Sequence, residues 1–156
     1  MERKNDLREC FSCSCFAARR AARLITQHYD RELRPTGLRA TQFSLLVILT
    51  LAGPMPLSVA ADRMGMERTT LTRNLRRLVA RGLIVVRATG DRRVRMLAAT
   101  ARGTAAARAA LPRWRTAQRS MADRLGTSGI RTLNLAAQAA AEISADSGGA
   151  SRGKGE

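Results

Sequence analysis

The chain has 156 residues and a formal net charge of +16, with 28 lysines and arginines against 12 aspartates and glutamates. This length suits one domain with a tail, and the charge favours a polyanion as partner. A biased genome also inflates arginine and alanine, so the positions of the charges matter more than their sum. No apolar run approaches the ~20 residues of a membrane span, and the N-terminus opens no signal-peptide core. We therefore expect no membrane association and a cytoplasmic protein.

The first long helix is expected from about Cys10 to Leu33, because apolar residues recur there at helical spacing. Pro35 and Gly37 end it. The next segment, residues 42–51, is apolar almost all round, as in a helix buried at the centre of a small domain.

A helix-turn-helix is predicted after this buried segment. Ser58 is a plausible N-cap for a short helix that carries Ala60, Ala61 and Met64. Gly65 then turns the chain directly into a second helix. Two short helices joined by a tight turn that contains glycine are typical of this motif.

The second helix, residues 66–82, is the stretch around which the rest is organised. Leu71, Leu75 and Leu78 form one apolar stripe, and Gly82 supplies a left-handed stop. The other side carries charge for phosphates and donors for base edges. The candidate DNA-binding residues of this helix are Arg68, Thr69, Thr70, Thr72, Arg73, Asn74, Arg76 and Arg77.

A β-hairpin is predicted immediately after that helix, with strands at residues 83–87 and 94–97 and a basic loop at 88–93. A hairpin in this position is a wing. Asp91 beside Arg92 and Arg93 indicates an acid that orients an arginine for entry into a minor groove. The alternative is a surface hairpin whose charges only keep it soluble.

Two more helices should follow. Thr100 can cap the first, in which Gly103 is a weak point, Pro112 a kink and Gly126 the stop. The last is amphipathic and alanine-rich, and the mixture of glycine, serine and charge after Ala145 indicates a disordered tail.

A homodimer follows from the flanking helices, whose apolar faces have little left to cover inside one chain. Two recognition helices would then lie about 34 Å apart, which suits a pseudo-palindromic site on double-stranded DNA. An intramolecular bundle is the alternative. The expected fold is mainly α with a small β-hairpin wing: a winged helix-turn-helix lobe (38–99), N- and C-terminal dimerisation helices (1–37 and 100–145) and a disordered tail (146–156).

The pattern from about Phe16 to Leu125 resembles the MarR family of winged-helix transcription regulators. The resemblance rests on Gly37-Leu38 with Gln42-Phe43, Met64-Gly65-Met66, Arg68 to Leu75, Leu78 with Arg81-Gly82-Leu83, and Asp91-Arg92-Arg93. It implies a dimer with interlocked terminal helices that represses a nearby promoter until an effector lowers its DNA affinity. It also implies groove-facing roles on the second helix and an Asp91–Arg93 wing pair.

Two positions depart from the family pattern. Arg39 stands where a capping threonine is common, and Glu67 stands where serine or aspartate usually caps the recognition helix. Glu67 still favours the helix dipole but is the poorer cap.

Cys10, Cys13 and Cys15 are an odd number of cysteines in six positions, a poor disulfide framework. Their sulfurs converge only if the helix unwinds locally or a partner chain supplies one. Three soft thiolates without a fourth ligand suit trivalent arsenic or antimony as an effector, whereas zinc normally takes four ligands. His28 is about 20 Å away along the helix and cannot complete the site. Thiol oxidation and simple packing remain the alternatives.

The sequence therefore predicts a dimeric, sequence-specific repressor, released by a metalloid sensed at these thiols. A redox-sensing repressor, a regulator responding to a small organic ligand and a non-specific architectural DNA binder are the alternatives. No cofactor is required. An enzyme is not expected, because no constellation of Cys, His and acid and no nucleotide loop is present.

Overall fold

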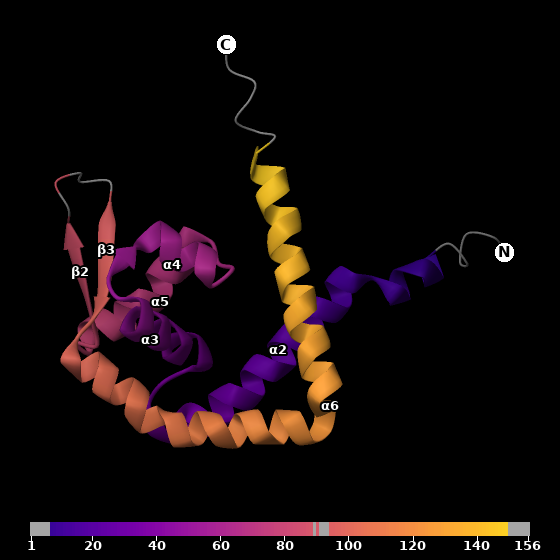
Figure 1. The fold of residues 1–156 in the computed structure, drawn as a ribbon, viewed down its shortest axis with the longest axis horizontal. Coiled ribbons are helices and arrows are strands. Elements are labelled where there is room, and N and C mark those ends of the chain that lie inside the picture. Colours follow the sequence, from indigo (N-terminus) through magenta and orange to yellow (C-terminus); the bar gives the residue numbers. More distant parts are fainter. Residues whose placement is uncertain (1–6, 89, 91–93, 150–156) are drawn as a thin grey trace, which may run out of the picture.

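The computed structural model of the protein describes residues 7–88, 90 and 94–149. It is mostly helical with one small antiparallel sheet, which confirms the predicted fold class (Figure 1). The elements in chain order are the 3₁₀-helix η1 (Leu7–Ser12), α2 (Ser14–Leu33), the 3₁₀-helix η2 (Arg34–Thr36), α3 (Ala40–Ala52), β1 (Met55–Pro56), α4 (Leu57–Arg63), α5 (Arg68–Ala80), β2 (Ile84–Ala88), β3 (Arg95–Ala99) and α6 (Ala101–Gly149).

The first α-helix begins later than the sequence predicts. Residues up to Ser12 form a 3₁₀-helix, and Cys13 is extended (φ −63°, ψ 115°), so α2 begins at Ser14 and not at Cys10. Every described side chain from Leu7 to Arg20 is exposed. Because helices in proteins are stabilised mainly by packing, nothing in the single chain extends α2 towards its N-terminus. At the other end, the turn at Pro35 and Gly37 (φ 70°) ends the helix as predicted.

The N-terminus of α3 is capped by a side chain from α2. Asp30 Oδ1 accepts the backbone N–H of Ala40 at 2.7 Å, and Gln42 Oε1 accepts that of Arg39 at 3.1 Å. These bonds satisfy donors that a helix leaves free at its start. They replace the hydroxyl cap that is missing at Arg39.

The two helices of the predicted helix-turn-helix are α4 and α5, joined by a turn at Gly65 (φ 59°). The start of α4 differs from the prediction: it begins at Leu57 after Pro56, and Ser58 lies inside its first turn and is not the N-cap. Proline just before the first turn is compatible with a helix because its missing N–H is not needed there. Glu67 precedes α5 without a side-chain capping bond, as expected of a poor cap.

The sheet contains one strand more than the sequence predicts. Its order is β1-β3-β2, with β3 antiparallel to both neighbours. The two strands of the hairpin are the predicted wing, with Val86 opposite Leu97. The short β1 pairs Met55 with Leu97, and a two-residue strand that ends in proline carries no pattern from which to predict it. The predicted wing-tip residues Asp91, Arg92 and Arg93 lie outside the described residues.

The start of α6 is hydrogen-bonded to the turn at Gly82 that follows α5. Thr100 Oγ1 accepts the N–H of Gly103 at 2.9 Å, the predicted cap, and donates to Gly82 O at 2.8 Å. Gly103 is not simply a weak point, however. A Cβ on it would lie 2.0 Å from the carbonyl oxygen of Leu83, so only glycine lets the helix approach that backbone.

The rest of α6 changes direction twice. The helix continues through Pro112, and Figure 1 shows its first half as two segments that meet at an angle, the bend that a proline inside a helix produces. At Gly126 (φ 67°, ψ 172°) the backbone leaves the helical conformation, as predicted, and the last part turns away. It stays helical to Gly149, so residues 146–149 are helical where the sequence predicts the tail.

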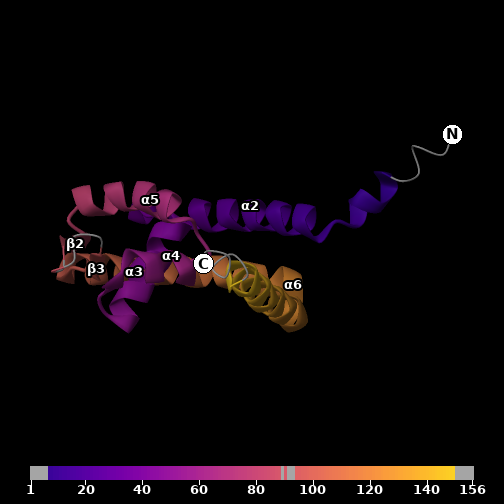
Figure 2. The ribbon, with the colours of Figure 1, turned by 90° about the horizontal axis from the view of Figure 1, so that it is seen from above.

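The middle of α6 packs on α2 and α3. Tyr29 OH donates to Gln118 Oε1, and the ring of Trp114 stacks on Phe43 with centroids 6.3 Å apart. His28 Nε2 lies 3.3 Å from Ala117 O, so this side chain takes part in the contact between α2 and α6. The described side chains of residues 7–20 and 131–143 are exposed in the single chain, and Figure 2 shows η1 extending beyond the rest of the fold. None of the described helices combines the length and apolarity that a membrane crossing requires.

We predict that Gly103→Ala destabilises the protein by about 2–3 kcal/mol, because the methyl group forces α6 away from Leu83. Ala105→Gly, at an exposed position of the same helix, is the control and should cost only about 1 kcal/mol. Chemical denaturation followed by circular dichroism measures both. Equal costs for the two variants would contradict the close approach.

Candidate nucleic-acid interface

The polar face of α5 is directed outward by its buried stripe. Leu71, Leu75 and Leu78 are 0%, 4% and 0% exposed, as predicted. At about 100° per residue, Thr69 and Arg73 lie opposite this stripe, with Arg76 beside them. These three side chains are exposed, as are Arg68 and Thr70. The helix therefore presents guanidinium and hydroxyl groups on one continuous outer surface.

Two of the predicted contact residues are less free than the others. Thr72 and Asn74 are half-buried at the flanks of the stripe. Thr72 Oγ1 donates to Arg68 O at 2.7 Å, so its proton is used within the helix. Its oxygen keeps lone pairs and can still accept a hydrogen bond.

Arg77 points to a different place from Arg73. It lines a hollow of about 540 Å³ between the end of α2, the start of α3 and the end of α5. We call this hollow the arginine notch. The residues that line it are Asp30, Arg34, Gly37, Leu38, Arg39, Gln42, Arg77, Ala80 and Arg81.

The described part of the wing adds two exposed arginines, Arg87 on β2 and Arg95 on β3. The sequence interpretation assigned them only to strands. The register pairs Arg87 with Met96 and Arg95 with Ala88, so the two arginines lie on opposite faces of the hairpin.

The three cysteines are exposed free thiols at the N-terminal end of the chain. Cys10 lies in η1, Cys13 at the break before α2 and Cys15 in the first turn of α2. Within the described ranges, no group of three or more His, Cys, Asp or Glu side chains is arranged to hold a metal ion. The break at Cys13 is nevertheless the local departure from regular helix that convergence of three sulfurs requires.

A smaller hollow of about 230 Å³ lies where α2, α3 and α6 meet, and no sequence pattern predicts it. It is lined mostly by apolar and aromatic side chains: Ile25, Thr26, Tyr29, Leu33, Ala40, Phe43, Ser44 and Trp114. Burial raises the pKa of Tyr29 above its usual value. A tyrosine hydroxyl is protonated at neutral pH, and here it donates to Gln118.

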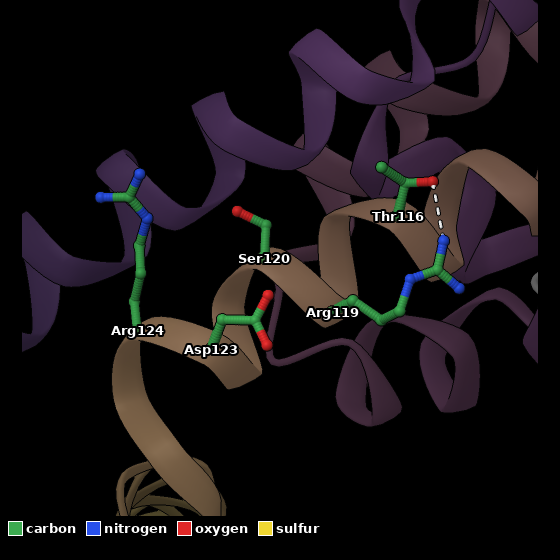
Figure 3. Close-up of a pocket in the computed structure, with 5 residues that line it drawn as sticks. All are labelled: Thr116, Arg119, Ser120, Asp123 and Arg124. Carbon is green, nitrogen blue, oxygen red and sulfur yellow. Dashed lines mark hydrogen bonds between the residues drawn. The ribbon is translucent and has the colours of Figure 1, made fainter.

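A third hollow is formed by one helix alone. Figure 3 shows Thr116, Arg119, Ser120, Asp123 and Arg124 side by side on α6, with Arg119 donating to Thr116 Oγ1 at 3.4 Å. Because no second element contributes a side chain, it is an open groove on a helix surface. We assign it no binding role.

A buried helix-turn-helix with a basic outer face, followed by a wing, defines a winged-helix DNA-binding protein. Residues 36–94 match the sequence model of the MarR family. The chain is 42% identical to the transcriptional regulator MosR of M. tuberculosis, solved in complex with DNA, with a TM-score of 0.70 over 83% of this chain and 98% of that one. It therefore belongs to the MarR family, and it is a DNA-binding transcriptional regulator and not an enzyme.

A curated relative and a further solved structure also match parts of the chain. An uncharacterized HTH-type transcriptional regulator of Bacillus subtilis (strain 168), YwoH, is 32% identical over 80 residues, which are 51% of this chain and 58% of that protein. The match therefore spans little more than half the length of this curated relative. A MarR-family regulator from Rhodococcus sp. RHA1 shares the fold, with 24% identity and a TM-score of 0.69 over 81% of this chain and 90% of that one.

We predict that Arg73→Ala lowers affinity for a specific duplex by about 1–3 kcal/mol and reduces its preference over random DNA, because Arg73 stands at the centre of the outer face of α5. Fluorescence anisotropy with a duplex selected by the wild-type protein from a random pool measures both affinities. Arg108→Ala, which removes a charge from the exposed side of α6, is the control. An unchanged ratio of specific to random affinity would exclude base reading by this residue.

Proposed function

We propose that the protein is a dimeric, sequence-specific repressor whose DNA affinity is controlled by chemistry at its N-terminal thiols. The observation that carries the thiol control is the position of the three cysteines. They are exposed on the segment that extends beyond the fold and needs a second chain to pack against. A change there alters the helices that set the distance between the two DNA-binding lobes.

In this proposal the outer face of α5 contacts bases and phosphates, and the wing contacts the neighbouring minor groove. Thr69, Arg73 and Arg76 have the exposure and direction for base edges, whereas Arg68 and Thr70 suit the backbone. A two-fold dimer places two copies of α5 on successive faces of the major groove, and a pseudo-palindromic operator matches that symmetry.

The dimer is supported by apolar side chains on the ends of the long helices. Phe16 and Leu24 on α2, and Leu133, Leu135 and Ile143 on α6, are between 42% and 69% exposed in the single chain. Several large apolar side chains exposed on two projecting helices favour a protein interface there.

The proposed effector is trivalent arsenic or antimony. Three thiols displace the three hydroxides of arsenous acid, which releases three molecules of water and changes no oxidation state. Each soft thiolate becomes one ligand of the metalloid. Bonding of Cys10, Cys13 and Cys15 to one ion would fold η1 back onto the start of α2, which changes the surface offered to the partner chain.

The close alternative is oxidation of the same thiols to sulfenic acid or a disulfide. Exposure supports it equally, and only two sulfurs need to meet. A different candidate, release by a small organic ligand, is favoured by the hollow that Phe43 and Trp114 help to line. Pockets that combine aromatic walls with a few polar groups are typical small-molecule sites.

We predict that Leu133→Glu shifts the protein from dimer to monomer, because a buried, unpaired carboxylate is costly at an interface. Sedimentation velocity at micromolar concentration measures the change. Arg131→Glu, exposed two residues away on the same helix, is the control. A variant that remains dimeric would show that α6 does not contribute this face.

We predict that antimonite or arsenite, added under reducing conditions, releases the wild-type protein from its selected duplex but does not release a Cys10→Ser/Cys13→Ser/Cys15→Ser variant. Fluorescence anisotropy follows release, and mass spectrometry counts the bound ions. Release only by peroxide, with the same dependence on cysteine, would replace the metalloid by oxidation. Insensitivity to all three reagents would reject thiol control and direct the search to organic ligands.

A further inference from the structure

The arginine notch carries charge that the base-reading face of α5 does not use. It is bounded by three elements that are far apart in the sequence: the end of α2 with η2, the start of α3 and the end of α5. Four arginines and one aspartate line it, which gives a formal charge of +3. The arginines are Arg34, Arg39, Arg77 and Arg81, and all four are exposed to solvent.

Two bonds hold the walls of the notch in place before any ligand arrives. Arg81 Nη1 donates to Gly37 O at 2.7 Å, which ties the end of α5 to the turn after α2. Gly37 has φ 70°, and a Cβ on it would lie 3.4 Å from Nη2 of Arg81, so the turn carries a glycine where the guanidinium packs closely. The remaining N–H groups of that guanidinium are donors that the Gly37 bond does not use.

The acid in the notch is already engaged. Asp30 Oδ1 accepts the N–H of Ala40 at 2.7 Å, so this carboxylate caps α3. Gln42, 5% exposed, uses its Oε1 for the N–H of Arg39. With that oxygen occupied, the NH₂ group is the part of the Gln42 side chain that has donors to offer.

We infer that the arginine notch binds a phosphate group. A tetrahedral phosphate presents acceptor oxygens in several directions, and guanidinium groups that approach from three elements can each donate to a different one. A planar carboxylate would engage fewer of them. The partial positive charge at the start of α3 adds to the same attraction.

The phosphate has two sources. The first is the DNA backbone: with α5 in a major groove, a phosphodiester strand borders the groove along the flank of α5 that carries Arg77 and Arg81. This source rests on DNA binding through α5. The second is a free phosphorylated ligand. It would contact Arg81 beside its bond to Gly37, and through that bond it would affect the orientation of α5.

The test uses full-length Arg34→Gln/Arg39→Gln, because neither side chain donates a hydrogen bond to another described residue. Arg34→Gln alone is a milder second variant. Arg108→Gln is the charge-matched control on α6. Binding of the selected duplex and of a random duplex is measured from 50 to 300 mM salt. Thermal shifts of the free protein are measured with inorganic phosphate and pyrophosphate against chloride at equal ionic strength.

If the phosphate belongs to DNA, the double variant loses affinity for both duplexes equally, and its slope of log affinity against log salt falls by about 1, the value for one phosphate contact. If it belongs to a free ligand, the slope is unchanged, and pyrophosphate raises the melting temperature of the wild type and the control but not of the variants. Unchanged slope with no specific shift in any protein overturns the inference. Because the wild type must first bind its selected duplex, failure of the DNA-binding proposal is seen separately.

Discussion

The buried leucine stripe of α5 is the constraint on which the rest of the structure depends. Leu71 and Leu78 are fully buried, and a helix that buries one side must present the other. The stripe therefore decides which arginines and threonines of α5 face outward. Everything around α5 holds this one orientation: α4 and the turn at Gly65 before it, the wing after it and the buried helix α3 beneath it.

Polar bonds between elements connect the two functional parts of the molecule. Asp30 of α2 caps α3, Arg81 at the end of α5 reaches the turn after α2, and Thr100 at the start of α6 holds Gly82. Each bond satisfies a backbone group at the end of an element. Since α2 and α6 also carry the exposed apolar side chains, these bonds are the contacts through which the proposed thiol control would reach α5.

The elements that the sequence predicted best are those with long, strongly periodic patterns. The stripe of α5, the glycine stops at Gly82 and Gly126, and the wing hairpin follow from local rules of spacing and backbone conformation. Helix starts were predicted less well. Ser58 had the chemistry of a cap but lies inside α4, and Cys10 had helical spacing but lies in a 3₁₀-helix, because start positions depend on what the preceding residues pack against.

For the candidate site, the pattern of residues along the helix identified the candidate side chains but not which residues from other elements lie beside them. Arg77 stood with Arg73 in the sequence, yet the fold directs it to a notch shared with Arg34 and Arg39, which are separated from it by the helices α3 and α4. The aromatic hollow beside Trp114 and the close contact of Gly103 with Leu83 were likewise invisible, because both arise where segments distant in the sequence meet.

The sequence by itself determined the class of protein, since the spacing of leucines, glycines and arginines already specifies a helix with a buried side, a stop and a basic outer face. Those are local properties, fixed within a few turns of the chain. Only the tertiary structure decided which arginines share the arginine notch and that Gly103 is the point where α6 contacts the backbone of Leu83. Those properties depend on how α2, α3, α5 and α6 pack, and packing between distant segments leaves no periodic trace in either of them.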